Sequence, residues 1–368
     1  MVVLSEKYLV SQNNGGRQEI VIIDIFIAVA DKGGVENVIN ATASYLKRQG
    51  NTVRLIQAVW EHHPWTCPEI DFYYLSDQRA NQDSEKWKNG YLNFLEENGY
   101  PDVILATNWP LMSLITRQVL AETGKRIPVV SWVHNPIERY AAAGYGGVEM
   151  LQYADAHLVI NQRIETEIRN AIANARTVRV NNPVSGDRVC YSENRTPQEL
   201  LFVGRISDQK NLPVLLYGIK KAKTDYYLTL IGEGPEETKL KRIVRENGLK
   251  EKVHFVGWSD DPWKATGQKG FLVMSSLYEG FPVTAIEALL SGMPVISTPV
   301  DGIVEIIKPG VNGFLYPQGD SDGLAEVLDY IAGGVLPVPT AEACRSSANP
   351  FLEENALPDF YEKLKGLI

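Results

Sequence analysis

Short apolar runs alternate with amphipathic stretches along almost the entire chain. The apolar runs are nearly continuous, as in strands that are buried on both faces. Strands and helices in strict alternation predict parallel sheets that are covered by helices on both faces. The predicted strands cover residues 19–29, 52–59, 72–75, 102–107, 127–134, 156–161, 177–181, 199–204, 226–231, 253–256, 270–275 and 294–298. The predicted helices cover residues 34–50, 87–97, 111–122, 164–173, 212–223, 236–247, 282–291, 303–307, 324–332 and 352–367. The fold class is therefore α/β.

The chain has 368 residues, which is long for one core and suits two domains. A polar, turn-rich linker over residues 184–198 separates two repetitions of the same architecture. We expect an N-terminal Rossmann-like domain over residues 1–183, a C-terminal one over 184–350, and a terminal helix over 351–368. Two doubly wound parallel sheets that face each other place the carboxyl ends of their strands at a shared cleft.

Composition excludes several classes of protein. The net charge of −9 argues against a nucleic-acid partner, because phosphate binding needs a basic surface. The cysteines are isolated from one another, at Cys67, Cys190 and Cys344, which fits a reducing compartment and no metal site. The longest apolar run contains Asp24 and is too short to span a bilayer. With no signal-peptide pattern, we expect a cytoplasmic protein. Residues 1–18 read as an appended segment without an assigned role.

The segment from Glu279 to Pro294 carries the strongest functional signal. Pro282 suits the first position of a helix, and Gly292 followed by Pro294 marks its end. Glu279 then lies just before the helix and Glu287 about a turn and a half inside it. The first amides of such a helix, here on Val283 and Thr284, form an anion site at the positive end of its dipole. The segment therefore predicts a phosphate cradle between two hydroxyl-binding carboxylates, as a nucleotide sugar requires.

The motif Ser-Ser-x-x-Glu-Gly-Phe-Pro, the Glu-x7-Glu spacing and the following Ala-x-x-x-Gly-x-Pro-Val resemble the retaining GT-B glycosyltransferases of family 4. The resemblance implies that Glu279 meets hydroxyls of the donor sugar and that Glu287 binds the nucleotide ribose. Phe281 belongs to the same motif and is taken with it as substrate-binding. The resemblance also implies that the terminal helix crosses back over the first domain. It is rich in motifs over residues 199–316 and sparse in the first domain.

Gly204, Arg205 and Lys210 follow the first predicted strand of the second domain. A glycine at a strand end permits close approach of the backbone to a ligand, and two nearby cations can clamp a diphosphate. The family uses this Arg and Lys for that purpose, whereas an isolated pair would be solvated surface charges. The one Asp-x-Asp, at Asp320 and Asp322, is better placed to cap the helix from residue 324 than to hold a metal. We expect no divalent ion and no cofactor other than the donor.

Gly33 and Gly34 occupy the first strand-to-helix turn, where glycines allow positive φ and leave room for a ligand. Tight turns also take this pair often, and Glu36 beside it suits either acceptor binding or a favourable place at the helix dipole. His134 ends an apolar strand, where most histidines have a structural role. The family has a histidine here, close to the anomeric carbon of the donor sugar.

Gly257 and Trp258 follow another strand of the second domain. Family members hold the nucleobase at this place by backbone contacts, and the indole of Trp258 could stack on the base. His62 and His63 lie in a loop flanked by Trp and Pro, which favours a plain surface loop over an acceptor contact.

Together these residues predict a retaining, metal-independent glycosyltransferase that moves a hexose from a nucleoside diphosphate sugar, expected to be UDP-hexose or UDP-HexNAc. His134, Arg205, Lys210 and Glu279 are the expected catalytic residues. The acceptor is a glycan, a lipid-linked glycan or a glycoprotein in bacterial surface glycan synthesis, and peripheral contact with the inner face of the membrane is common in the family. The sugar, the acceptor and the oligomeric state stay open.

Alternatives remain at this stage. An inverting GT-B transferase would need a base on the acceptor side, for which Glu36 or His134 could serve. A nucleotide-sugar epimerase shares the fold but not the Glu-x7-Glu context. A catalytically silent partner subunit that only binds glycan or protein would lack the clamp or a glutamate, and here all four residues are present.

Overall fold

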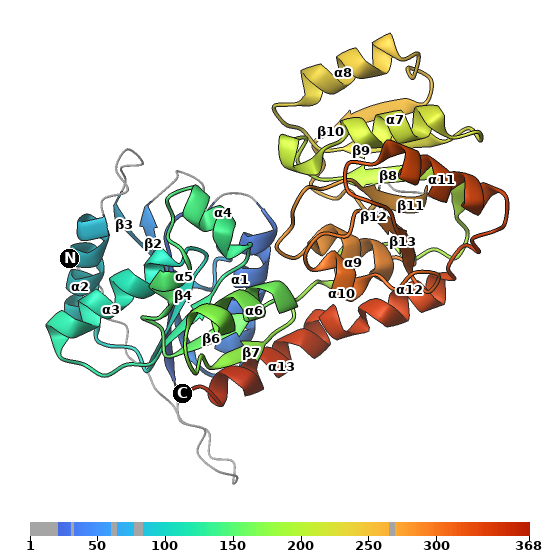
Figure 1. Ribbon diagram of the computed structural model, residues 1–368. Coiled ribbons are helices and arrows are strands. Elements are labelled where there is room, and N and C mark those ends of the chain that lie inside the picture. Colours follow the sequence, from blue (N-terminus) through green and yellow to red (C-terminus); the bar gives the residue numbers. More distant parts are fainter. Residues whose placement is uncertain (1–20, 31–32, 60–64, 77–83, 265–268) are drawn as a thin grey trace, which may run out of the picture.

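The computed structural model describes residues 21–30, 33–59, 65–76, 84–264 and 269–368. His62, His63 and residues 1–18 lie outside these ranges. The described chain forms two parallel β-sheets, each with its own helices, which confirms the predicted α/β fold class (Figure 1).

The first sheet has seven strands in the order β3-β2-β1-β4-β5-β6-β7, and all of its neighbours are parallel. Its strands are β1 (Ile22–Ile27), β2 (Thr52–Val59), β3 (Asp71–Ser76), β4 (Val103–Thr107), β5 (Val129–Trp132), β6 (Ala156–Val159) and β7 (Thr177–Arg179). The helices of this domain are α1 (Gly34–Arg48), α2 (Ser84–Asn98), α3 (Leu111–Thr123), α4 (Ile137–Ala142), α5 (Val148–Leu151) and α6 (Gln162–Ala171).

The second sheet has six strands in the order β10-β9-β8-β11-β12-β13. Its strands are β8 (Thr196–Val203), β9 (Tyr227–Ile231), β10 (Val253–Gly257), β11 (Lys269–Met274), β12 (Val295–Ser297) and β13 (Gly313–Leu315). The helices that follow them in sequence are α7 (Pro213–Lys221), α8 (Glu237–Glu246), α9 (Val283–Leu290), α10 (Ile303–Ile306), α11 (Ser321–Ala332), α12 (Ala341–Ala348) and α13 (Glu353–Lys365). Short 3-10 turns are η1 (Gly186–Arg188), η2 (Asp208–Lys210) and η4 (Asn349–Phe351).

A buried charge in the middle of β1 is compensated by its neighbours. Asp24 is fully buried and receives hydrogen bonds from Arg54 Nε at 2.6 Å and Nη2 at 2.9 Å. The hydroxyl of Tyr91 donates to the same carboxylate at 2.7 Å. Burial raises the pKa of Asp24, and the Arg54 guanidinium opposes that rise. The otherwise apolar strand therefore tolerates a carboxylate because the carboxylate is paired.

The last helix of the chain packs on the first domain (Figure 1). Phe360, Tyr361 and Leu364 of α13 belong to the apolar core of that domain. The ring of Phe360 lies 5.0 Å from the ring of Trp132 on β5. Asn51 donates a hydrogen bond of 3.2 Å to the hydroxyl of Tyr361. The chain therefore connects the two domains twice, before β8 and through α13.

Several predicted boundaries are wrong by a few residues, and some elements were not predicted. Strand β8 begins at Thr196, inside the predicted linker. Four short elements were absent from the prediction, since each is too short to show a clear period: α4, α5, β13 and α12. Within the described ranges, no helix combines the length and the apolarity needed to cross a bilayer.

Candidate functional site

The strand order of the two sheets determines where the predicted site residues lie. In the first sheet β1 lies between β2 and β4, and in the second β8 lies between β9 and β11. Connections leave such a sheet toward opposite faces at these points, so a crevice opens at the carboxyl ends of the strands. Gly33 follows β1 and His134 follows β5, whereas Arg205 follows β8 and Glu279 follows β11.

A cleft of about 650 Å³ lies between the two domains. The first domain contributes residues after β1 and β2, and the second contributes the ends of β8 and β9, the residues just after β10 and the start of α9. Its lining includes Gly33, Gly34, Glu36, Asn37, Trp65, Gly204, Arg205, Gln209, Lys210, Gly232, Trp258, Val283, Thr284 and Glu287.

A smaller cavity of about 210 Å³ adjoins the cleft. Four residues line both spaces: Gly34, Lys210, Val283 and Thr284. The smaller cavity is lined in addition by Val35, His134, Asn135, Asn182, Glu279, Gly280, Phe281 and Pro282. Of the residues predicted to form the site, Gly257 alone lines neither space.

The start of helix α9 forms part of the wall that is common to both spaces. Its apolar side is buried as predicted, with Ala285, Ile286, Ala288, Leu289 and Leu290 at most 2% exposed. The prediction that Pro282 begins the helix is wrong by one residue. Pro282 has φ −79° and ψ 88°, so it precedes the helix, and its carbonyl accepts a hydrogen bond from Ala285 N at 3.0 Å. The amides of Val283 and Thr284 are therefore in the first turn, where they have no intrahelical acceptor.

The two predicted cations differ in their environments. Arg205 is exposed at the cleft, and no ion pair of its guanidinium is seen in the described part of the chain. Lys210 Nζ lies 2.6 Å from Glu279 Oε1, and the hydroxyl of Ser276 donates to the same oxygen at 2.6 Å. Both contacts that the described residues make with the Glu279 carboxylate thus end on Oε1, which leaves Oε2 for a ligand. An ammonium has three donors, so Lys210 can hold Glu279 and an anion together.

Gly33 and Gly34, the pair after β1, leave room in the cleft because they lack side chains, and neither adopts a backbone conformation that requires glycine. Gly33 has an extended backbone with φ −164°, and neither glycine has positive φ, so that prediction was wrong. A Cβ on Gly34 would lie 3.7 Å from Val283 in the other domain. A Cβ on Gly33 would lie 3.0 Å from the carboxylate of Glu36. Gly34 therefore lies within van der Waals reach of the other wall of the cleft, whereas a side chain on Gly33 would crowd Glu36.

His134 is buried, with 3% of its surface exposed. Its Nε2 lies 3.1 Å from the hydroxyl of Thr107, the last residue of β4, and its Nδ1 has no hydrogen-bond partner among the described residues. Burial lowers the pKa of His134 to about 3, so the ring is neutral near pH 7. A Cβ on Gly280 would lie 1.8 Å from the His134 carbonyl oxygen, so only glycine fits at this contact between the domains.

Three further predicted residues lie at the rims of the site. Trp258 is 59% exposed at the cleft, and its backbone amide donates to Glu233 Oε1 at 3.2 Å. Gly257 ends β10 with φ 86°, and its carbonyl accepts a hydrogen bond from Gly232 N at 2.8 Å. The ring of Phe281 lies 5.3 Å from that of Phe351 and packs against the cores of both domains. Phe281 thus has a packing role in addition to lining the cavity.

Acidic residues form no cluster suited to a metal in the described ranges, where no group of three or more His, Cys, Asp or Glu is so placed. The predicted role of Asp320 is confirmed: its carboxylate caps α11 by accepting from the amides of Asp322 at 3.0 Å and Gly323 at 2.9 Å. The helix begins at Ser321, earlier than predicted.

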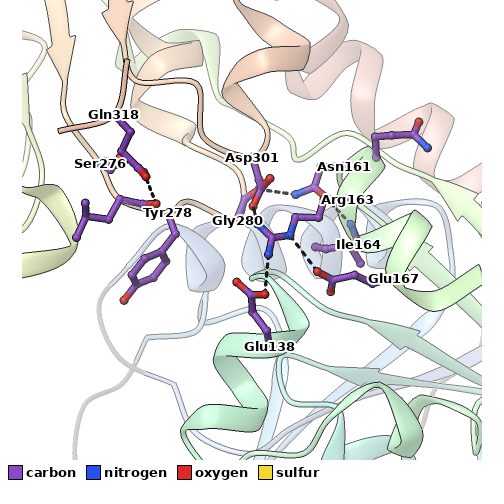
Figure 2. A network of polar contacts seen from close by, with 12 residues as sticks. Glu138, Asn161, Arg163, Ile164, Glu167, Ser276, Tyr278, Gly280, Asp301 and Gln318 are labelled. Carbon is purple, nitrogen blue, oxygen red and sulfur yellow. Dashed lines mark hydrogen bonds and ion pairs between the residues drawn. The ribbon is translucent and has the colours of Figure 1, made fainter. Parts of the chain in front are cut away.

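Polar contacts fix the Glu279 loop against the first domain (Figure 2). Asn161 is fully buried at the end of β6, and its Nδ2 donates to the Gly280 carbonyl at 2.8 Å. Its Oδ1 accepts from Ile164 N at 2.9 Å and caps α6. Arg163 in α6 pairs with Asp301 of the second domain at 2.7 Å and with Glu138 of the first at 2.7 Å. The loop that carries Glu279 is therefore anchored across the domain boundary.

The site residues that sequence reasoning missed include Thr107, Asn161, Asn182 and Gln209. Three of them follow or end strands of the first sheet, which is where ligands meet parallel sheets. That position was the available signal. Gln209 lies between the two cations and donates to the Tyr278 carbonyl at 2.9 Å, so it positions the loop before Glu279.

Comparison with known proteins assigns the chain to a family. A model described as glycosyl transferases group 1 matches residues 187–334. A lipopolysaccharide 1,6-galactosyltransferase of Escherichia coli (strain K12) is 32% identical over 246 residues, which cover 64% of this chain and 67% of the relative. The chain belongs to the group 1 glycosyl transferases. The protein of the same name from Salmonella typhimurium is 31% identical over 244 residues, covering 64% of this chain and 66% of that protein. The matched segment thus spans about two thirds of each relative.

Solved structures of other proteins share the fold of this glycosyl transferase over most of its length. The apo form of the lipopolysaccharide outer core galactosyltransferase WaaB matches 94% of this chain and 99% of its own, with a TM-score of 0.81 and 25% identity. HepE from Anabaena, solved in complex with UDP, matches 94% of this chain and 99% of its own with a TM-score of 0.77. At 18% identity the likeness to HepE shows the fold alone. The architecture of this group 1 glycosyl transferase is GT-B.

Proposed function

We propose that this group 1 glycosyl transferase is a retaining, metal-independent enzyme of family 4 that moves a hexose from a UDP-sugar to a hydroxyl group of a glycan. One observation carries the proposal: Arg205, Lys210 and the first turn of α9 line a single cleft between the domains. Two cations and free amides around one space suit a diphosphate. Glu279 and His134, in the adjoining cavity, suit the sugar.

The chemistry follows from where the positive charge lies. As the bond between the anomeric carbon and the diphosphate oxygen breaks, Arg205, Lys210 and the amides stabilise the growing negative charge on the leaving UDP. The acceptor hydroxyl attacks the anomeric carbon from the face that the diphosphate leaves, and a diphosphate oxygen takes its proton. The configuration at the anomeric carbon is retained. The protein is not required to supply a general base, and His134, which stays neutral with a pKa of about 3, serves to position the sugar.

The donor and acceptor classes rest on further observations. Trp258 presents an exposed indole at the cleft for the base, and Glu287 lines the same cleft for the ribose. HepE was solved with UDP, and two relatives are named lipopolysaccharide 1,6-galactosyltransferases. We therefore place this protein in bacterial surface glycan synthesis on the cytoplasmic side, with a glycan, lipid-linked or protein-linked acceptor. Peripheral membrane contact follows if the acceptor is lipid-linked.

A binding panel tests this function. The full chain is titrated with UDP-galactose, UDP-glucose, UDP-GlcNAc, GDP-mannose and ADP-glucose, each with and without EDTA, and thermal stability is measured. We expect stabilisation by a UDP-sugar that EDTA leaves unchanged. Slow hydrolysis of that sugar without acceptor separates an enzyme from a silent binding subunit, and NMR of the glycosidic bond formed with an acceptor hydroxyl separates retention from inversion. An inverted product, or binding that needs a divalent ion, contradicts the proposal.

A further inference from the structure

Thr107 connects two strand ends beside the small cavity. It is the last residue of β4 and lies opposite Trp132 on β5. Its Oγ1 lies 2.9 Å from the Trp132 carbonyl oxygen and 3.1 Å from His134 Nε2. Thr107 is fully buried, so these contacts account for its hydroxyl.

The two neighbours of the Thr107 hydroxyl determine which of them its proton points toward. A carbonyl oxygen only accepts hydrogen bonds, so the Thr107 proton lies toward Trp132. Toward His134 the hydroxyl then offers a lone pair, and Nε2 must be the nitrogen that carries the ring proton. A neutral imidazole has a single N–H, and burial keeps the pKa of His134 near 3, so Nδ1 is left with a lone pair.

Nδ1 of His134 has no protein partner in the described part of the chain, although it is buried. The same is true of Oδ1 of Asn182, a residue that is 4% exposed. Both residues line the cavity of about 210 Å³. Buried acceptors without partners are uncommon and costly in proteins, so two of them at one cavity indicate a ligand that donates hydrogen bonds.

We propose that Thr107 is a positioning residue that fixes the Nε2–H form of His134, so that His134 Nδ1 and Asn182 Oδ1 together select a donor sugar by its hydroxyl protons. This inference rests on the proposed function for the identity of the ligand. A sugar hydroxyl satisfies either acceptor. A sugar position without a hydroxyl leaves one of these two acceptors without a hydrogen-bond donor. A carboxylate at that position is repelled, because its lone pairs face those of His134 Nδ1 and Asn182 Oδ1. The cavity therefore takes neutral hexoses and rejects analogues that are deoxygenated or oxidised to the acid at the contacted position.

The tautomer is tested first, without any ligand. Long-range ¹H–¹⁵N spectra of the full chain, labelled at histidine, identify which nitrogen carries the proton, and the His134→Gln variant assigns the signal. We expect the Nε2–H form in the wild type and in Thr107→Ser. We expect a mixed or Nδ1–H ring in Thr107→Val. A wild-type ring protonated on Nδ1 overturns the proposal. Should Thr107→Val fail to fold, the wild type and Thr107→Ser still decide the question.

Donor selection is tested by calorimetry with UDP-galactose, UDP-glucose and their monodeoxy analogues. For the wild type and Thr107→Ser, we expect at least one hydroxyl whose removal weakens binding about tenfold or more. In Thr107→Val that discrimination should shrink, whereas UDP alone should bind as in the wild type. Equal discrimination in Thr107→Val and the wild type overturns a positioning role. If no UDP-sugar binds, the proposed function and the selection of the sugar are both contradicted, whereas the NMR spectra still show which nitrogen of His134 carries the proton.

Discussion

At the scale of single residues, Arg205 and Glu287 should affect different kinetic parameters. Arg205→Ala should lower kcat on the order of 100- to 1,000-fold with a smaller change in KM, because it acts on charge that develops in the transition state. Glu287→Ala should instead weaken donor binding about tenfold, since the lost hydrogen bonds are to the bound ribose. Steady-state kinetics with the UDP-sugar from the binding panel measure both effects.

Two exposed residues of α8 provide matched controls, Arg242→Ala and Glu246→Ala. Neither lines the cleft or the small cavity. Both should behave as the wild type. An Arg205→Ala enzyme with unchanged kcat contradicts the assignment of the diphosphate to this cleft wall.

Gly280 is the residue at which the smallest substitution should have a large effect. An added Cβ would lie 1.8 Å from the His134 carbonyl oxygen, which is backbone and cannot rotate away. Gly280→Ala should destabilise the protein by about 1–3 kcal/mol and weaken donor binding, since its loop carries Glu279. Urea denaturation and calorimetry measure the two effects.

The control for this substitution is Gly366→Ala in the turn after α13. Its added Cβ meets nothing closer than 3.5 Å, and its φ of −69° suits alanine. Wild-type stability of Gly280→Ala would show that the two domains do not meet as described.

At the scale of elements, Asn161 serves a helix and the site together. Asn161→Asp keeps the acceptor that caps α6 but replaces the donor to the Gly280 carbonyl by an oxygen. We expect a loss of about 1–3 kcal/mol in stability and a higher KM for the donor. Asp320→Asn also exchanges amide and carboxylate at a helix cap, but in the described part of the chain the Asp320 side chain bonds only backbone amides, so this variant should be nearly neutral. Equal effects of the two variants would argue that Asn161 is only a cap.

Local signals made α9 predictable from sequence. Pro282, the apolar residues from Ala285 to Leu290, and Gly292 specify its start, its buried side and its end within one residue. The alternation of strands and helices likewise predicted the fold class, because each β-α unit is encoded locally. The residues at strand ends could be proposed as site residues for the same reason.

Contacts between distant segments were not predictable. The hydrogen bond from Asn161 to Gly280 joins residues 119 positions apart, and its existence depends on how the domains meet. The pairing of Thr107 with His134 depends on the register of β4 against β5. The extended backbone of Gly33 shows the limit of composition, since two glycines suggest positive φ although here they only provide space.

At the scale of the whole molecule, two buried histidines make stability depend on pH. Burial lowers the pKa of His157 to about 4 and that of His134 to about 3. The unfolded chain takes up these protons near pH 6.5, whereas the folded chain resists them until far lower pH. The free energy of unfolding should therefore be largest above about pH 6.5 and fall as the pH is lowered toward 4.

Urea denaturation between pH 7 and pH 4.5 measures this slope. Of the two histidines, His157 lines neither the cleft nor the small cavity, and His157→Asn removes it. The change in the free energy of unfolding per pH unit should then become smaller by up to about 1.4 kcal/mol. A slope that is unchanged in His157→Asn would show that this ring is already protonated in the folded protein.

The central claim is that the space between the domains holds a diphosphate through protein cations and helix amides. A crystal structure of the full chain with UDP, grown once with EDTA and once with Mg²⁺, tests it most directly. We predict that the diphosphate lies within hydrogen-bond distance of Arg205, Lys210 and the amides of Val283 and Thr284 in both crystals. A nucleotide bound elsewhere, or a diphosphate held through a magnesium ion, would contradict it.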